Sequence, residues 1–551
     1  MRKWAWLVLP LAFLLMSAGW AVTSPAGSSP DDDYHLASIW CAAGEESGRC
    51  QRDPSDPQAR LVPANVVGAA DCYRFRGDQS AACTRANSTA LVSTIRVNET
   101  AGLYPSGFYR LMGLLVGPDV DRSVLLMRLL NSLIAALVLA AMIGLTPRGV
   151  SSAASIAILA TFVPLGLFIA ASTNPSSWTM IGIAGFWAMA LAWLRTPTPR
   201  SRRGVLLGVA TLATAALGIL SRVDANAYVV LTAIIVLILA VNSRAQVRAS
   251  IGRLLVIGGI CIAAFAQYLS VSSTSLVIPG MNDAGGALGS ADAGIGLLMT
   301  NLVYLPVLFQ GIVGGTPLGW FDTTMPPLIP VVGTLVVGAL LYRGMRQANR
   351  RTLIAAGLAA AALILVPILF LQAQHLGVGE VVQPRYLLPL LTILVATISV
   401  GPRFDQSIEL RRAPAFTIAA PLVISATLAF WANAQRYLIG SAAPLFDRGL
   451  VPEWQPLLVI PVGLIAVITA LATAVFVAGV MLMGVTEPLI KRGARHSPAV
   501  DDLLGPPAHS IDPVRATLGV THGATPDSKG LVGVVEEHAE VDAIRAHMQR
   551  G

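Results

Sequence analysis

Stretches of about 20 apolar residues recur along most of this chain, and each is long enough to cross a bilayer as a helix. Of the 551 residues, 54% are hydrophobic and only 12% are charged, whereas a soluble domain carries roughly 25% charged residues. Backbone groups in lipid must be hydrogen-bonded internally, which favours helices. The sequence therefore predicts an all-α integral membrane protein with about 12 transmembrane helices.

These apolar stretches divide the chain into parts. The expected helices lie near residues 4–22, 124–145, 152–171, 178–194, 204–220, 227–241, 254–272, 326–342, 353–371, 386–400, 414–433 and 456–483. We predict a first transmembrane helix at 1–22, an extracytoplasmic loop or cap at 23–122, a polytopic membrane domain at 123–490, and a cytoplasmic, largely disordered tail at 491–551. Arg2 and Lys3 before an apolar run also fit a signal peptide, but the run is long enough to span, so we expect an uncleaved helix.

Arginines in the short joints between spans predict the orientation. The Arg-rich joints are Arg195–Arg203, Arg244–Arg253, Arg343–Arg351, Arg403–Arg412 and Lys491–Arg495. Such joints favour the cytoplasmic side, so we expect both termini in the cytoplasm. An Ala- and Arg-rich, Lys-poor composition suggests a high-GC bacterium, and we expect the protein in the bacterial plasma membrane. The net charge of +8 follows from these joints and gives no reason to expect nucleic acid as a partner.

One apolar segment breaks the alternation of sides. Counting residues 301–313 as a further span would move Arg343–Arg351 to the outside and reverse everything after it. We therefore expect 295–317 to form a re-entrant or interfacial helix on the outer side. Such a segment is allowed where protein or a water-filled cavity satisfies its backbone, which predicts a cavity open to the outside.

Four of the five cysteines lie in the first outer loop, at Cys41, Cys50, Cys72 and Cys83. In an oxidising compartment four cysteines predict two disulfides, with three connectivities. We expect Cys41–Cys50 and Cys72–Cys83, because both loops are short. Zinc binding is the alternative, although the spacings are too wide for paired Cys-x-x-Cys knuckles.

Three consecutive carboxylates, Asp31 to Asp33, stand just beyond the first span. Their mutual repulsion is explained if a cation, a phosphate–metal pair or a proton transfer uses them. A solvated acidic turn is the alternative interpretation. If the segment is functional, its place at the mouth of a hydrophobic protein suggests chemistry on a lipid-linked substrate.

Several outward-facing motifs resemble those of the domain of unknown function 2142 family of bacterial membrane proteins, over roughly residues 4–440. The motifs are Pro30–His35, with Asp32 where the family has Glu; Leu103–Tyr109, with Ser106 where it has Pro; Ser172–Pro175; Leu318–Asp322; and Gln383–Pro389. The family resembles GT-C glycosyltransferases. The resemblance implies a GT-C-like fold and transfer of a sugar from a polyprenyl-phosphate donor to a cell-envelope glycan or lipid acceptor, outside the cytoplasm.

The resemblance also implies a catalytic acidic residue in the first outer loop. Asp31 and Asp32 are the candidates, as a general base for the acceptor hydroxyl or as ligands of the acceptor or of a divalent cation. No other cofactor is expected. Arg385 could fork onto the donor phosphate, or it could be an interfacial arginine that snorkels.

The remaining candidate substrate-binding residues each have a structural alternative. His35 could orient a carboxylate or bind phosphate, or it could cap a helix. Trp320 and Asp322 could hold a sugar, or Trp320 could anchor the interface. The other candidates are Tyr109 of the aromatic motif, Asn174 in a turn, Arg222 beside Asp224, Gln383 in a loop, and Tyr386 as an anchor.

Two other functions stay open. A transporter or flippase of lipid-linked glycans would show polar residues at mid-membrane or broken helices in matching halves, and few charges and no halves are seen. A non-catalytic envelope-assembly protein would tolerate loss of the acidic motif.

Overall fold

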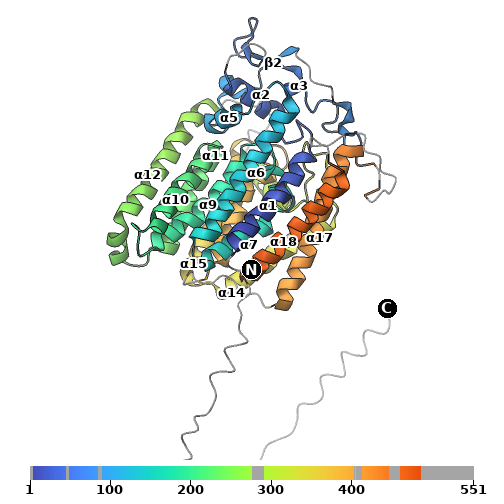
Figure 1. Cartoon of the computed structure of the whole chain (residues 1–551). Helices are drawn as coiled ribbons and strands as arrows, with labels where there is room; N and C mark the ends of the chain where they lie inside the picture. The colour runs from blue at the N-terminus through green and yellow to red at the C-terminus, as the bar shows by residue number, and fades with distance from the viewer. Residues whose placement is uncertain are drawn as a thin grey trace, which may run out of the picture. The chain divides into compact units, whose positions relative to one another are not determined.

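Long apolar helices form most of the protein, which we describe from a computed structural model (Figure 1). The structure describes residues 4–44, 49–84, 90–275, 291–401, 404, 412–442, 444–445, 454 and 460–484. The predicted tail, 491–551, lies outside them. All of the described residues belong to one unit, Met1–Glu487.

Twelve helices of the described residues are long and apolar enough to cross a membrane. They are α1 Ala5–Val22, α6 Val120–Leu145, α7 Arg148–Thr161 continued by η2 Phe162–Gly166 and α8 Leu167–Ala170, α9 Ser176–Arg195, α10 Arg202–Ile219, α11 Val223–Ala240, α12 Arg244–Ser275, α13 Ala291–Ile312, α14 Leu328–Gln347, α15 Arg350–Ala373, α17 Arg412–Ile439 and α18 Val462–Gly484. The prediction of about 12 such helices is confirmed.

The membership of this set differs from the prediction at two places. The expected span at 386–400 is α16, Pro384–Ser399, which has only 16 residues and is therefore about 24 Å long. It is shorter than the roughly 30 Å of a hydrocarbon core, and all of its residues except Tyr386 are buried between other helices. The twelfth long apolar helix is instead α13, the segment that we expected to be re-entrant or interfacial.

Capping side chains start several of these helices. Asp119 accepts a hydrogen bond from the Arg122 backbone N–H at 3.1 Å at the start of α6. Ser201 does the same for α10, and Asn349 for α15. Each cap satisfies one of the backbone donors that a first helical turn leaves free.

The helices differ in how much lipid they can meet. Every residue in the apolar window of α7–α8 is buried, as are 94% of those in α9, whereas only 22% are buried in α12. α1 packs against α6 and α18. The buried helices α7–α9 and α16 therefore form the centre of the membrane domain, and α12 lies at its edge.

The segment between α1 and α6 forms a cap at one end of the helices (top of Figure 1). It contains α2 Asp32–Ala42, β1 Gln51–Arg52, β2 Arg60–Pro63, α3 Ala64–Val67, η1 Ala81–Cys83, β3 Leu91–Thr94, α4 Asn98–Ala101 and α5 Ser106–Gly113. The three strands form a small antiparallel sheet in the order β1-β2-β3, which the sequence did not predict.

Both predicted disulfides pin this cap. Cys41 is bonded to Cys50 and Cys72 to Cys83, with Cα–Cα distances of 5.0 and 5.9 Å. The sequential pairing is confirmed. Zinc binding by these four cysteines is excluded, because their sulfurs are bonded to one another. The fifth cysteine, Cys261, is free and half-buried in α12.

Helix α13 contacts the cap-side ends of its neighbours along its length. The Gly294 carbonyl, near its start, accepts a bond of 2.8 Å from Gln372, one residue before the end of α15. Near its other end, Gly311 lies so close to Pro384, the first residue of α16, that a side chain there would collide with it. Both ends thus lie on the cap side, which agrees with the predicted interfacial course.

Candidate active site at the junction of cap and membrane helices

A salt bridge joins the cap to the membrane domain at Asp31 and Arg385. Asp31 precedes α2 with a left-handed backbone, φ 59°, and its carboxylate accepts a bond of 2.5 Å from Arg385 Nη2 in the first turn of α16. The Arg385 side chain is 2% exposed and that of Asp31 is 32% exposed. The structure thus brings together the predicted base and the predicted phosphate-binding residue.

The charge of Arg385 sets the protonation of this carboxylate. Burial alone would raise the pKa of Asp31, but the opposing charges, Arg385 foremost, hold it below its ordinary value. Opposite charge at close range favours the ionised form of a carboxyl group. Asp31 is therefore an anion at neutral pH, as a general base must be.

Two arginines and one tyrosine ring extend the site away from Asp31. The guanidinium carbons of Arg222 and Arg385 lie 4.2 and 5.0 Å from the ring centroid of Tyr386. Arg385 also donates to the Tyr386 hydroxyl at 3.2 Å. Arg222, a predicted substrate-binding residue, is forked onto Asp224 at 2.8 and 3.1 Å. Two cations thus lie against one aromatic ring, beside the partly exposed carboxylate.

His35 lies behind the salt bridge, fully buried in α2. Its Nδ1 is 2.9 Å from the Tyr109 hydroxyl, and its ring is 5.2 Å from that of Tyr104. Among the described residues Nε2 has no hydrogen-bond partner. Burial lowers the pKa of His35 to about 3, so the ring is neutral and is suited to positioning rather than to neutralising a phosphate.

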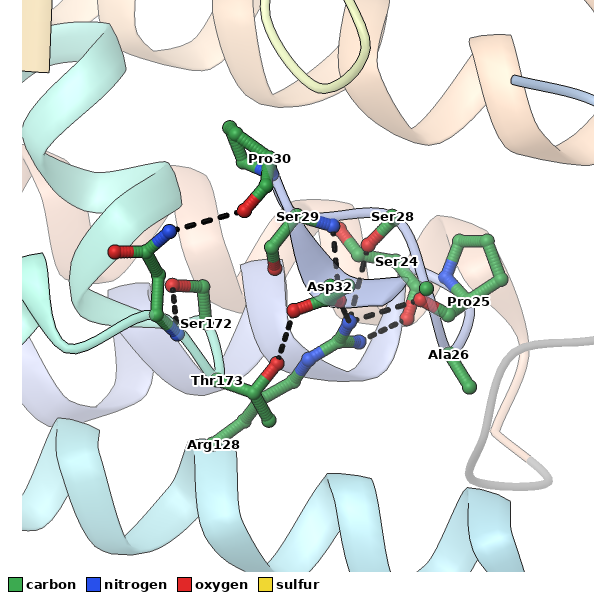
Figure 2. Close-up of polar contacts among 12 residues, drawn as sticks. Ser24, Pro25, Ala26, Ser28, Ser29, Pro30, Asp32, Arg128, Ser172 and Thr173 are labelled. Carbon is green, nitrogen blue, oxygen red and sulfur yellow. Dashed lines mark hydrogen bonds and ion pairs between the residues drawn. The ribbon is translucent and has the colours of Figure 1, made fainter. Parts of the chain in front are cut away.

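Asp32, the next residue after Asp31, is fully buried and contacts Thr173 and Arg128 (Figure 2). Thr173 donates to one carboxylate oxygen at 2.6 Å, and the Ser29 backbone N–H donates to the other at 3.1 Å. The guanidinium of Arg128 lies 3.8 Å away. Burial raises the pKa of Asp32 to about 6. Its oxygens already have partners, so it is placed to hold the turn rather than to meet a substrate.

Arg128 is a functional candidate that the sequence reasoning missed. It belongs to α6 and is fully buried. Its nitrogens donate to the carbonyls of Ser24 at 2.5 Å and Pro25 at 2.8 Å, and to the Ser28 hydroxyl at 3.0 Å (Figure 2). A charged residue inside an apolar span was the available signal.

Asn174 holds the same turn from the other side. Its side chain is fully buried, and its amide donates to the Pro30 carbonyl at 3.0 Å. Its oxygen accepts from the Ser176 backbone N–H at the start of α9. Asn174 therefore fixes the residue before Asp31, in keeping with the turn role expected for it.

Trp320 and Asp322 join a membrane-domain loop to the cap. The Trp320 indole N–H donates to the Gly27 carbonyl at 2.8 Å. Asp322 accepts from Arg436 at 3.0 Å and from the Phe75 backbone N–H at 3.1 Å. Their hydrogen-bonding groups thus have partners within the protein and hold the loop against the cap. The sugar contacts of Trp320 and Asp322 stay a prediction.

Gln383 and Arg385 line a small pocket with Pro30, Gly311, Pro317 and Phe321. Its volume is about 20 Å³, enough for one or two water molecules. The guanidinium end of the candidate site therefore opens onto a space beside α13.

No group of three or more metal-ligating side chains includes Asp31 or Asp32 among the described residues. The group that does lie within ligand distance is Cys41, Cys50 and Glu99, and its sulfurs form a disulfide. A divalent cation at Asp31 would compete with Arg385 for the carboxylate.

A comparison with known protein families matches most of the chain. The domain of unknown function 2142 family, described as predicted membrane proteins, matches residues 14–394. The chain belongs to this family. That range contains the whole cap and the Asp31–Arg385 pair. No curated protein and no solved structure matches the chain.

Proposed function

We propose that this protein is a membrane glycosyltransferase of GT-C type that transfers a sugar from a polyprenyl-phosphate donor to a cell-envelope glycan or lipid acceptor. The observation that carries the proposal is the Asp31–Arg385 pair. One partly exposed carboxylate and one buried guanidinium meet at the mouth of a hydrophobic domain. A base and a phosphate-binding cation are the two groups that this transfer requires.

In this proposal the two side chains separate when substrates bind. A donor phosphate oxygen takes the place of Asp31 on Arg385, which can hold it with two parallel bonds. Asp31 then accepts the proton of the acceptor hydroxyl. The acceptor oxygen attacks the anomeric carbon, the bond from that carbon to the phosphate oxygen breaks, and the electron pair leaves with the polyprenyl phosphate.

The surrounding residues position this pair. Asp32, Arg128 and Asn174 fix the turn on which Asp31 stands. Neutral His35, held by Tyr109, packs behind it. Arg222 and Tyr386 flank Arg385. We assign the exposed, ionised Asp31 as the base and Asp32 as a positioning residue, which narrows the pair of candidates named from the sequence.

The proposed side of the membrane is the outer face of a bacterial plasma membrane. Arginines gather at the ends of the helices away from the cap, where Arg203 donates to the Leu145 carbonyl and Arg351 to that of Val241. Cytoplasmic loops favour such residues. Both termini would then be cytoplasmic. A cysteine placed at Gln347 should resist a membrane-impermeant thiol reagent in intact cells, and its labelling from outside would contradict the orientation.

The activity is tested with purified full-length protein, radiolabelled polyprenyl-phosphate sugars and envelope acceptors. The wild type should transfer label to an acceptor. Asp31→Asn should lower turnover about 100- to 10,000-fold, the usual effect of losing a positioned base. Asp33→Asn is the matched control, because Asp33 pairs with Arg96 in the cap. Transfer that is unaffected by Asp31→Asn, or absent with every donor, would contradict the proposal.

A further inference from the structure

A large cavity lies between the end of α13 and the start of α14. Its volume is about 450 Å³, within the range of about 300–1,000 Å³ that ligand sites occupy. Its lining is mostly apolar and includes Gln310, Gly314, Pro317, Met325, Val331 and Leu335. We call this cavity the α13–α14 groove.

The groove is open on the side of α14 that faces away from the protein. Val331 and Leu335 are 55% and 67% exposed. They lie within the first 8 residues of a helix long and apolar enough to span, so they are within about 12 Å of its cap-side end. At that depth the surrounding solvent is the hydrocarbon of the cap-side leaflet. A hydrocarbon chain can enter the groove from the membrane.

The inner end of the groove meets the candidate active site. Pro317 lines both the groove and the small pocket that contains Arg385 and Gln383. On α13, Gln310 lines the groove and the adjacent Gly311 lines the pocket. An apolar channel from the membrane therefore ends beside a buried guanidinium. This arrangement fits the shape and polarity of a lipid that has an anionic head group and a long hydrocarbon chain.

We propose that the α13–α14 groove binds the hydrocarbon chain of the lipid-phosphate donor, with its phosphate at Arg385. The inference rests on the donor class of the proposed function and adds the path of the chain. Lipid tails are as apolar as the groove, so apolar contact alone would not select this ligand. The contact between the phosphate head group and Arg385 makes the binding selective for this ligand. The groove directs the hydrocarbon chain away from the acceptor side.

Photocrosslinking tests this path in the full-length protein, reconstituted in nanodiscs of phosphatidylethanolamine and phosphatidylglycerol. The probe is polyprenyl phosphate that carries a diazirine in the isoprene units nearest the phosphate. Peptide mass spectrometry should find the label between Met325 and Leu335. Unlabelled polyprenyl phosphate should compete, whereas uncharged polyprenol and added phosphatidylglycerol should not.

Two groove-filling variants sharpen the test. Thr334→Trp and Val331→Trp place an indole in the groove at exposed positions, where folding should tolerate it. Both should abolish labelling of 325–335. Met345→Trp is the control, an equally exposed position at the far end of α14. It should leave the labelling unchanged, and the thermal midpoints should show that all three variants are folded.

The outcomes separate this inference from the proposed function. Label elsewhere on the protein that polyprenyl phosphate competes away and Arg385→Ala removes would overturn the groove but keep the lipid-phosphate donor. Groove labelling that phosphatidylglycerol removes equally well would reveal an ordinary bilayer lipid and would overturn the inference. Selective groove labelling without sugar transfer in the radiolabel assay would keep the lipid site and count against the transferase.

Discussion

Asp31 and Asp32 are adjacent in sequence, and each faces an arginine from a different membrane helix, yet their surroundings differ. Asp32 is fully buried, and its oxygens accept bonds from Thr173 and Ser29, with Arg128 at 3.8 Å. Asp31 is 32% exposed and contacts Arg385 at 2.5 Å. The reason is the backbone: Asp31 has a left-handed conformation before α2, and Asp32 is the first residue of the helix.

The comparison shows how one short motif can supply both structure and chemistry. A carboxylate whose oxygens are used inside the protein stabilises one arrangement of the turn. A partly exposed carboxylate whose side-chain partner is one arginine can exchange that partner for a substrate. The burial of each pair, rather than its charges, decides which of these roles is available, since both pairs have the same two charges.

Arg128→Ala should have the largest effect on the comparison, and on folding. It leaves the carbonyls of Ser24 and Pro25 without their donor and Asp32 without its nearest cation. Breaking a buried ion pair typically costs about 3–5 kcal/mol. We expect a low yield of folded protein and a lower thermal midpoint in detergent. Arg122→Ala, at an exposed position of α6, is the control. Equal thermal midpoints for both variants would count against the structural role of Arg128.

The pH dependence of stability should report on Asp32. Its folded pKa, about 6, lies above its ordinary value of 3.8, so the native state binds the proton more tightly. Its contribution to stability is therefore full below about pH 4 and is lost as the pH rises through about 6, by up to about 3 kcal/mol.

The thermal midpoint of the wild type, measured from pH 4 to pH 7, checks this. The part of the thermal midpoint that depends on Asp32 should fall as the pH rises, and this pH dependence should be missing from Asp32→Asn. The difference between the two proteins isolates Asp32, because both contain every other titratable group. These groups include Asp31, whose pKa is shifted in the opposite direction. Parallel curves for wild type and variant would show that Asp32 does not titrate in this window.

Substitution of Arg385 should act on chemistry, and a lysine should recover only part of it. Arg385→Ala removes the phosphate partner, and loss of one such donor typically costs about 100- to 1,000-fold in turnover. Arg385→Lys keeps a point charge but not the planar fork. We expect turnover in the radiolabel assay to rank wild type, Lys, then Ala. The control is Arg96→Ala, which alters a cap pair with Asp33 and should leave turnover near that of the wild type. Full activity of Arg385→Ala would show that Arg385 does not belong to the site.

Much of the fold was predictable from the sequence because apolar length and cysteine placement are local signals. The long spans, both disulfides and the meeting of Asp31 with Arg385 follow from length, loop size and the side of the membrane assigned to each motif. The cap-side position of α13 also followed, since the arginines after α14 fixed the side on which that helix begins.

The division of labour between the carboxylates was not predictable. It depends on Arg128, whose partners are backbone carbonyls about 100 residues away, and no sequence pattern marks a carbonyl as an acceptor. The anchoring contacts of Trp320 and Asp322 were hidden for the same reason. The sheet in the cap has strands of only 2–4 residues, too short for an alternating pattern to be seen.

The most direct test measures folding and sugar transfer on the same preparations of Asp31→Asn and Asp32→Asn. In Asp31→Asn the amide oxygen can still accept from Arg385, and asparagine tolerates the left-handed backbone. The account predicts a near-normal thermal midpoint with transfer almost abolished. Asp32→Asn should show a changed midpoint, with transfer lowered only as far as the folded fraction falls. Equal loss of transfer at equal midpoints in both variants would contradict the separation of roles.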